Sequence, residues 1–423
     1  MRRATGPTLA AVLLALRPAT VEAQLPPASV GSSALGRHDV ALVRDFGAVA
    51  VNPAGLGLGR DGTTGTVLPV RAGSGMHPVS LGDVARWQGV PVPDRVRERW
   101  LRRIVEEGAQ RGASVMEVTP IAVAHDRFGL QLSTVAAARV GLNPDAAELL
   151  LYGNAGRTGQ PRAFDLAGSR VDGWVVSTLA LGHGRTVGAV GPGRLAVGFT
   201  AKLVFGHAVI VGRDLGTSLD GDPLEGEVHF PILSNGGNDD LHHGTGIALD
   251  VGAAWEGPRL SLGLAVRNLF NTFEWDLSGL VYRTGTVLFD QEDAESDFDE
   301  RPARSAPGHL RAAARALGFG PTVEAGLAWT VGPNLRLVAS GEQRGGDDPI
   351  RGWRTRGGVG AEWLPHERVP LRAHVGAAGG SMEMGGGASV RLGPVWIALA
   401  ASLHPGGGDE ESTGAFGVSW NAR

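Results

Sequence analysis

The chain has 423 residues and a formal net charge of −4, so its overall charge gives no support to nucleic-acid binding. It contains 66 glycines and no cysteine, and the lack of cysteine excludes disulfides, thiol nucleophiles and cysteine-ligated zinc. Glycine far above the usual ~7%, with no collagen period, predicts many turns and strands rather than long helices.

Residues 1–23 have the pattern of a secretory signal peptide. Arg2 and Arg3 precede the apolar run Leu9–Leu16, which is shorter than the ~20 residues that span a bilayer as a helix. Val21 and Ala23 suit positions −3 and −1, which places cleavage after Ala23. Since no later apolar stretch has the length of a membrane helix, we expect an exported protein that is either soluble or a barrel.

The next segment carries a glycine motif typical of dinucleotide-binding turns. Within "AVAVNPAGLGLGRDG" (48–62), Gly57, Gly59 and Gly62 spell G-x-G-x-x-G. A pyrophosphate site needs a helix directly after these glycines. The following residues are rich in Thr, Gly and Val and include Pro69, so we expect no helix and no nucleotide at this motif.

A helical insert is predicted at about residues 79–108. In "PDRVRERWLRRIVEEG", Val96, Trp100 and Ile104 recur at helical spacing, and Pro93 suits a first helical position. The segment is too charged to span lipid. It is therefore either a plug or periplasmic element, or a helix packed on the end of a barrel. Another helix is predicted from Asn143, as N-cap, to Gly153.

Much of the chain alternates between apolar and polar residues in segments of about ten, and we count roughly 13 to 16 such strands. In "GIALDVGAAWE" and "RLSLGLAVRNL" the alternation continues across a turn at Gly257-Pro258, which predicts a hairpin. A β-sandwich would bury the apolar face, whereas a membrane barrel would turn it to lipid. The signal peptide, the small residues on the polar faces and the aromatic strand ends favour the barrel. Those aromatics are Trp255, Trp329, Trp363 and Trp420.

In a barrel, the polar faces of these strands line the lumen. The candidate lumen residues are Lys202, Asp250, Arg267, Glu324, Arg336, Glu362, Arg372 and His374. Charges of both signs on an inner face usually pair and close a pore, so an open ion channel is disfavoured.

Two polar stretches are weak candidates for metal binding. The acidic segment 289–305 lacks the central glycine of a calcium loop and is interpreted as a solvated loop. "NDDLHHG" (238–244) would need a turn to bring its histidines together. We expect no metal, no cofactor and no enzymatic activity, because no P-loop, G-x-S-x-G or H-E-x-x-H motif is present. A lumen enzyme would instead require a Ser-His pair or paired carboxylates within hydrogen-bond reach.

The segment "VRDFGAVAVNPAGLGLG" resembles the region near the mature N-terminus of FadL-type outer-membrane transporters and their PorV-type and TraF-like relatives. The matching residues are Asn52, Pro53, Ala54, Gly55 and Leu56, and the strands at 194–208 and 246–255 resemble two further family patterns.

This resemblance implies a transmembrane barrel of about 14 strands (63–423) with an N-terminal plug (24–62). In the transporters the plug acts as a hatch, and ligands leave sideways through the wall. For this chain we expect location in the bacterial outer membrane, contact with its lipids, insertion by barrel-assembly machinery and passage of hydrophobic small molecules. The alternative is a barrel that serves as a scaffold for secretion or surface assembly.

Overall fold

The computed structural model describes residues 25–422 except 60, 154–155, 161, 222–223, 228–229, 236–242, 291–292, 319, 346–353, 380 and 405–409. The predicted signal peptide and most of "NDDLHHG" therefore lie outside the described residues. No helix of the described part is long and apolar enough to cross a membrane.

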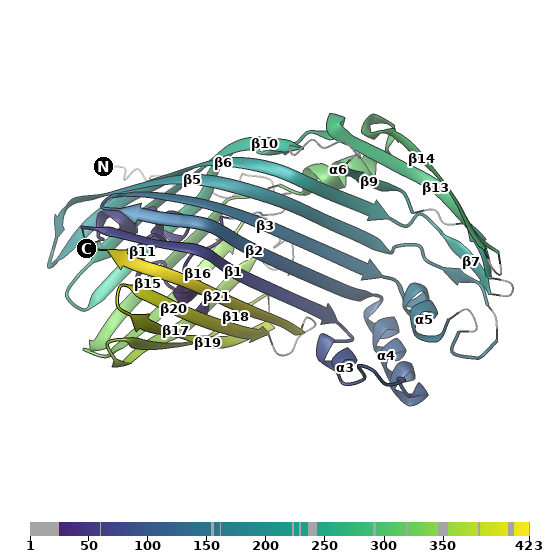
Figure 1. Cartoon of the computed structure of the whole chain (residues 1–423), viewed down its shortest axis with the longest axis horizontal. Helices are drawn as coiled ribbons and strands as arrows, with labels where there is room; N and C mark the ends of the chain where they lie inside the picture. The colour runs from purple at the N-terminus through teal and green to yellow at the C-terminus, as the bar shows by residue number, and fades with distance from the viewer. Residues whose placement is uncertain are drawn as a thin grey trace, which may run out of the picture.

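The described chain forms a closed antiparallel barrel of 14 strands, as the sequence predicts (Figure 1). The first strand pairs with the last, with Thr63 opposite Ala422, so the wall has no free edge. The strands are β1 (Thr63–His77), β2 (Gln110–His125), β3 (Phe128–Leu142), β5 (Arg170–Val190), β6 (Gly193–Arg213), β10 (Gly244–Glu256), β11 (Leu260–Asn271), β15 (Thr322–Gly332), β16 (Leu335–Arg344), β17 (Thr355–His366), β18 (Val369–Ala378), β19 (Ser381–Leu392), β20 (Val395–His404) and β21 (Glu410–Ala422).

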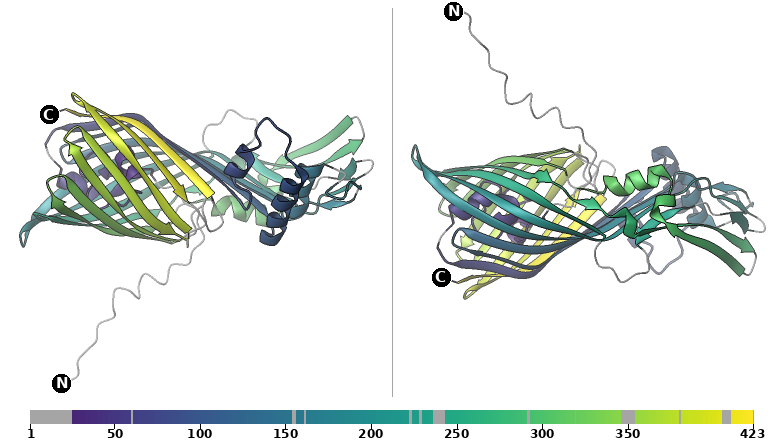
Figure 2. Two further views of the ribbon diagram at one scale, coloured as in Figure 1. Left: turned by 90° about the horizontal axis from the view of Figure 1, so that it is seen from below. Right: turned by 90° about the horizontal axis from the view of Figure 1, so that it is seen from above.

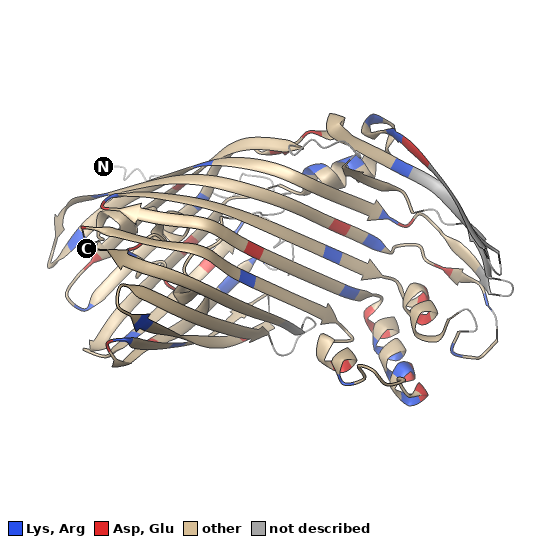
Figure 3. Ribbon diagram, viewed as in Figure 1, with Lys and Arg blue, Asp and Glu red and all other residues tan. Residues whose placement is uncertain are grey.

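The alternation of the sequence matches the two faces of the wall. Leu262 and Leu264 on one face of β11 are about 45% exposed, whereas Ala265 and Arg267 on the opposite face are buried inside. The predicted hairpin of β10 and β11 forms across Gly257-Pro258. Charged residues are sparse on the strands that face the viewer in Figure 3 and dense on α4. An apolar exterior over a polar lumen is the arrangement of a membrane-spanning barrel.

The two ends of the barrel differ (Figure 2). At the short-turn end, strands are joined by tight turns such as 126–127, 191–192 and 257–259. At the long-loop end lie the connections 78–109, 143–169, 214–243 and 272–321. Strands β5 and β6 have 21 residues each, twice the length expected from the alternation, and extend the wall beyond the barrel at the long-loop end.

The long connections hold most of the helices. They contain α3 (Leu81–Ala85), α4 (Asp94–Glu107), α5 (Pro144–Tyr152), η3 (Leu277–Gly279), η4 (Ala303–Ser305) and α6 (Gly308–Ala316). The predicted helical insert thus contains α3 and α4, and Asn143 caps α5 as expected. Pro93 is the N-cap of α4 rather than its first residue, because its ψ of 147° is extended.

Short strands complete the long-loop end. They are β9 (Ile232–Asn235), β12 (Glu274–Trp275), β13 (Leu280–Asp290) and β14 (Asp293–Pro302), together with a small separate sheet of β4 (Phe164–Asp165), β7 (Ser218–Gly221) and β8 (Leu224–Glu227). The acidic segment predicted as a loop is largely the strand β14. Its backbone pairs with β13, whose sequence "LVYRTGTVLF" is rich in strand-forming residues, and this pairing was not anticipated.

Candidate functional site

The N-terminal segment lies inside the barrel, where its helices α1 (Val30–Ala34), α2 (Ala48–Val51) and η2 (Pro53–Gly57) are visible between the strands (Figure 2). Its apolar side chains form a core with small inward-facing alanines of the wall. Wall side chains donate hydrogen bonds to its backbone, from Thr200 to Val49 (2.8 Å) and from Gln131 to Pro26 (2.7 Å). The lumen is therefore occupied across its middle by the chain's own N-terminus.

Asn52, the first residue of the predicted motif, ties this segment to the wall. Its amide donates to the carbonyl oxygens of Val40 (3.0 Å) and Ala253 (3.2 Å), and its Oδ1 accepts from the N–H of Ala54. Pro53 begins the 3₁₀ turn that follows. The turn approaches the wall so closely that a Cβ at Gly198 would collide with the backbone of Pro53. Small residues on the polar strand faces thus make room for the segment.

Two predicted lumen residues, Lys202 and Asp250, form a buried ion pair at 2.5 Å. Asn268 on β11 joins this pair, because its Oδ1 accepts from Lys202 (2.5 Å) and its backbone N–H donates to Asp250 (2.7 Å). Asn268 carries a positive φ of 51°, which is uncommon outside glycine. The alternation did not predict Asn268 as a lumen residue. Arg267 before it already points inward, so strict alternation would turn Asn268 outward.

A second charged group surrounds Arg267, which is 4% exposed. Its guanidinium contacts Glu324 (2.7 Å) and Glu342 (3.1 Å), and Glu342 also pairs with Arg344 (2.7 Å). Buried charges are tolerated only when they are paired in this way. Arg267 and Glu324 were predicted lumen residues, whereas Arg344 was not.

The remaining predicted lumen residues belong to two further groups. Glu362 lies between Arg336 (3.2 Å) and Arg372 (2.7 Å), and the Arg336 side chain is 47% exposed near the short-turn end. His374 contacts the carbonyl of Ala34 in the N-terminal segment (3.1 Å). It also lies 3.5 Å from Glu383, which pairs with Arg356 at 2.7 Å, and His404 stands at 3.5 Å on the other side.

The structure contains a Ser-His contact of the kind that a lumen enzyme would need. Nδ1 of His38 lies 2.8 Å from Oγ of Ser340 on β16. Neither residue lines the two cavities described below, and the contact joins the N-terminal segment to the wall. Within the described ranges, no group of three His, Asp or Glu side chains is placed to hold a metal ion.

Two adjoining cavities flank the N-terminal segment. One of about 780 Å³ opens at the short-turn end and is lined by residues of both charges, including Asp61, Asp126 and Arg194. The second, of about 260 Å³, shares Asp45 and Arg372 with the first. It extends to the wall at Thr66, Trp396, Gly417 and Ser419, where β1, β20 and β21 meet.

The wall is interrupted beside this smaller cavity. Strand β1 shifts its register with β21 between Val67 and Val70, and its pairing with β2 skips Leu68 and Pro69 without a shift. Pro69 lies in this gap and Pro120 in the corresponding part of β2, and neither can donate a ladder hydrogen bond. A Cβ at Gly417 would lie 2.8 Å from Val30 and 3.0 Å from Pro69. Helix α1 therefore covers the interruption from inside.

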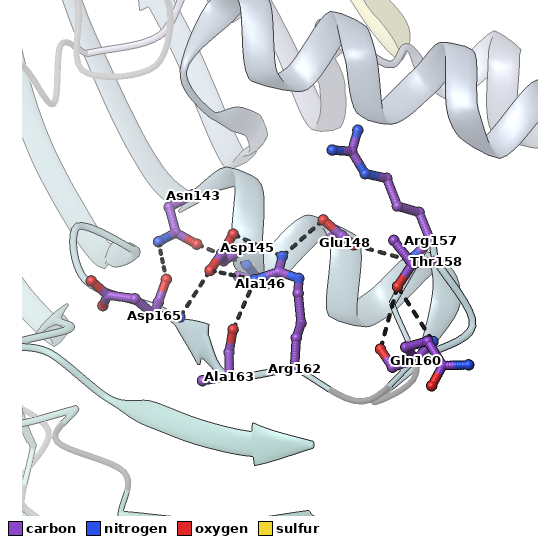
Figure 4. A network of polar contacts seen from close by, with 10 residues as sticks. All are labelled: Asn143, Asp145, Ala146, Glu148, Arg157, Thr158, Gln160, Arg162, Ala163 and Asp165. Atoms are coloured by element: carbon purple, nitrogen blue, oxygen red, sulfur yellow. Dashed lines mark hydrogen bonds and ion pairs between the residues drawn. The ribbon is translucent and has the colours of Figure 1, made fainter. Parts of the chain in front are cut away.

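At the long-loop end, a polar network fixes the connection after β3 (Figure 4). Arg162 donates to Asp145 (3.0 Å) and Glu148 (2.8 Å) on α5. The hydrogen bonds from Arg162 lower the pKa of Asp145. Burial opposes ionisation of Glu148, but the bonds from Arg162 and from the Arg157 N–H outweigh it, so the pKa of Glu148 is also lowered.

Comparison with known proteins supports the fold assignment. Residues 79–270 match the model of a family described as "Family of unknown function (DUF5723)". A search of curated proteins finds no match. Among solved structures, the chain is similar to the toluene transporter TbuX of Ralstonia pickettii (12% identity, 95% of this chain and 99% of that chain, TM-score 0.50).

It is also similar to the toluene transporter TodX of Pseudomonas putida (11% identity, 94% of this chain and 98% of that chain, TM-score 0.52). The monoaromatic hydrocarbon channel CymD matches at the same identity and TM-score, over 94% of this chain and 97% of that chain. Identities this low establish the fold rather than the activity. The chain has the fold of the FadL-like barrels, as its N-terminal motif predicts.

Proposed function

We propose that this protein is an outer-membrane barrel through which small apolar molecules pass from the long-loop end to a lateral exit in the wall. The observation that carries this proposal is the interrupted wall at Leu68-Pro69 beside the 260 Å³ cavity, covered from inside by α1. In bacterial outer-membrane barrels short turns face the periplasm and long loops face outward. The proposed route therefore leads inward.

Two features support an apolar cargo. Buried apolar side chains gather at the long-loop end, among them Trp174 on β5, Val209 on β6 and Phe273 in the connection after β11. The solved structures of similar fold include toluene transporters and a monoaromatic hydrocarbon channel. A lateral exit suits such a cargo, because an apolar molecule partitions into lipid rather than into water.

The proposed lateral exit can be tested with a larger side chain that blocks it. Gly417→Val places methyl groups against Val30 and Pro69, and we expect it to reduce uptake of radiolabelled toluene by cells that produce the protein. Gly414→Val on the same strand is the matched control, because a Cβ there meets nothing within 4 Å. Equal uptake by both variants, or no uptake above cells with empty vector, would refute the proposal.

A second candidate is a scaffold for surface or secretion partners. Two observations favour it. The lumen is occupied, and β4, β7 and β8 in the long connections form a small sheet that is separate from the barrel sheet. This candidate predicts a stable partner in pull-downs from cross-linked cells and no toluene uptake by the producing strain.

A further inference from the structure

A third cavity lies where the N-terminal segment meets the seam between the first and last strands of the wall. It measures about 20 Å³, and its lining includes Ser33 and Arg37 of that segment, Arg71 on β1, and residues of β20 and β21. Arg71 is the cross-strand neighbour of Ala415, so the cavity lies against the pairing that closes the barrel. A space of this size holds one particle about as large as a water molecule.

Almost every polar residue of this lining can donate hydrogen bonds through its side chain. These donors are Arg37, Arg71, Arg356, Ser33, Ser402 and Thr413. Glu383 is the only carboxylate among the described residues that line the cavity, and Arg356 already donates three hydrogen bonds to it, at 2.7 to 2.9 Å. Since a guanidinium group donates hydrogen bonds and accepts none, the lining favours an acceptor that carries negative charge.

The positive charges at this cavity outnumber the negative ones. Arg71 pairs with Glu117 (2.7 Å), and Arg356 pairs with Glu383 (2.7 Å). Arg37 adds a third guanidinium, so the lining residues and these ion-pair partners together hold three positive charges and two negative ones. The side chains of Arg71 and Arg356 are only 15% and 4% exposed. Because buried charge is tolerated when an opposite charge balances it, the cavity calls for one small anion.

The turn after α1 places Arg37 at the cavity. Gly36 and Arg37 both have a φ of 62°, in the left-handed region that arginine rarely adopts. The turn is held by a hydrogen bond from the Arg37 backbone N–H to the carbonyl of Ser32 (2.7 Å). A Cβ at Gly36 would collide with the ring of His374 on β18. Backbone strain of this kind persists where the surroundings hold it, often at binding sites, and here it directs a cation to a cavity already rich in cations.

We infer that this cavity is a binding site for a small monovalent anion, a halide such as chloride, held between the N-terminal segment and the closing strands β1 and β21. Its size admits a halide but not a carboxylate or phosphate group, which are larger than one water molecule. The ion attaches the N-terminal segment to the wall in addition to Asn52. This inference goes beyond the proposed function and depends on neither the cargo nor the lateral exit.

Bromide is the probe for the site, because it replaces chloride and scatters X-rays anomalously. Crystals of the purified protein grown in sodium bromide should show an anomalous peak between Arg37, Arg71 and Arg356. The peak should be absent from Arg37→Asn in the same salt, since asparagine suits the left-handed backbone but carries no charge. A native cavity without bromide would overturn the site, and an equal peak in Arg37→Asn would overturn the charge argument.

Stability in solution gives an independent test, since folded and heat-unfolded barrels migrate differently on a gel. The conversion temperature should rise as sodium bromide replaces sodium gluconate at constant ionic strength, because an ion that binds only the folded state stabilises it. Arg37→Asn should need roughly tenfold more bromide for half of the rise, the effect of losing a hydrogen bond to a charged group. Arg368→Asn, at an exposed turn, is the matched control and should respond like the native protein.

Ser402→Asp separates anion binding from a general loss of stability. It places a carboxylate in the cavity as a substitute for the ion. We expect this variant to unfold in gluconate at a higher temperature than the native protein and to gain nothing from bromide. A bromide response as large as that of the native protein would refute the inference. That outcome would leave the lateral exit untouched, because the Gly417→Val uptake experiment involves no anion.

Discussion

Asn52 shows how one side chain can hold a segment inside a barrel. It is fully buried, and the three hydrogen bonds of its side chain all go to backbone groups, one of which belongs to the wall. A buried carbonyl that loses its donor carries the full cost of desolvation. The amide at this position therefore attaches the N-terminal segment to the wall.

We expect Asn52→Ala to reduce the free energy of unfolding by about 1–3 kcal/mol, because the carbonyls of Val40 and Ala253 lose their donor. The measurement is the temperature at which the folded gel band converts to the unfolded one. Asn334→Ala, at an exposed turn, is the control. Identical conversion temperatures would show that Asn52 does not secure the segment.

Arg267 allows a sharper test of the buried charges. Arg267→Met leaves Glu324 and Glu342 without their shared cation, and breaking a buried pair in this way costs about 3–5 kcal/mol. Adding Glu324→Gln should recover part of that loss, because one unpaired charge is removed. If the double variant unfolds at the temperature of Arg267→Met or below it, the charge explanation is wrong.

At the scale of single elements, the stability of the connection after β3 should depend on pH. The pKa values of Asp145 and Glu148 are lowered in the folded state. Their contribution to stability is therefore complete above their ordinary pKa values of ~4, and it is lost as the pH falls through the lowered values. The peptides from 143–165 should therefore lose protection from hydrogen exchange as the pH falls from about 5 to about 2.

Arg162→Gln is the control for this pH dependence, because it removes the hydrogen bonds that lower both pKa values. Its peptides should be less protected at neutral pH and should change little on acidification. Protection that responds equally to acid in both proteins would point to another group.

The elements also show what the sequence can and cannot predict. The hairpin at Gly257-Pro258 and the capped helix after Asn143 follow from local signals, namely alternation and turn and cap chemistry. Helix α6 was not predicted, although Leu310 and Ala314 recur at helical spacing, because it has only nine residues and no side-chain N-cap. Arg356 was likewise missed, since its pairing with Glu383 on β19 requires the arrangement of the strands, which composition does not contain.

For the whole molecule, the closed lumen predicts the absence of bulk ion flow. The N-terminal segment fills the middle of the barrel. Purified protein in planar bilayers should therefore show no steady conductance. A steady open-pore current through the native protein would contradict both this prediction and the proposed route.

The pairing of β1 with β21 sets the order in which the molecule can be made. Thr63 and Ala422 are neighbours in the wall but lie at opposite ends of the segment that forms the barrel, 63–422. Bringing them together across a flexible chain of this length costs about 5 kcal/mol of loop-closure entropy. Because β1 and β21 are the paired strands farthest apart in the chain, we expect their pairing to close the wall last. The N-terminal segment would then be enclosed at that step, when the wall closes around it.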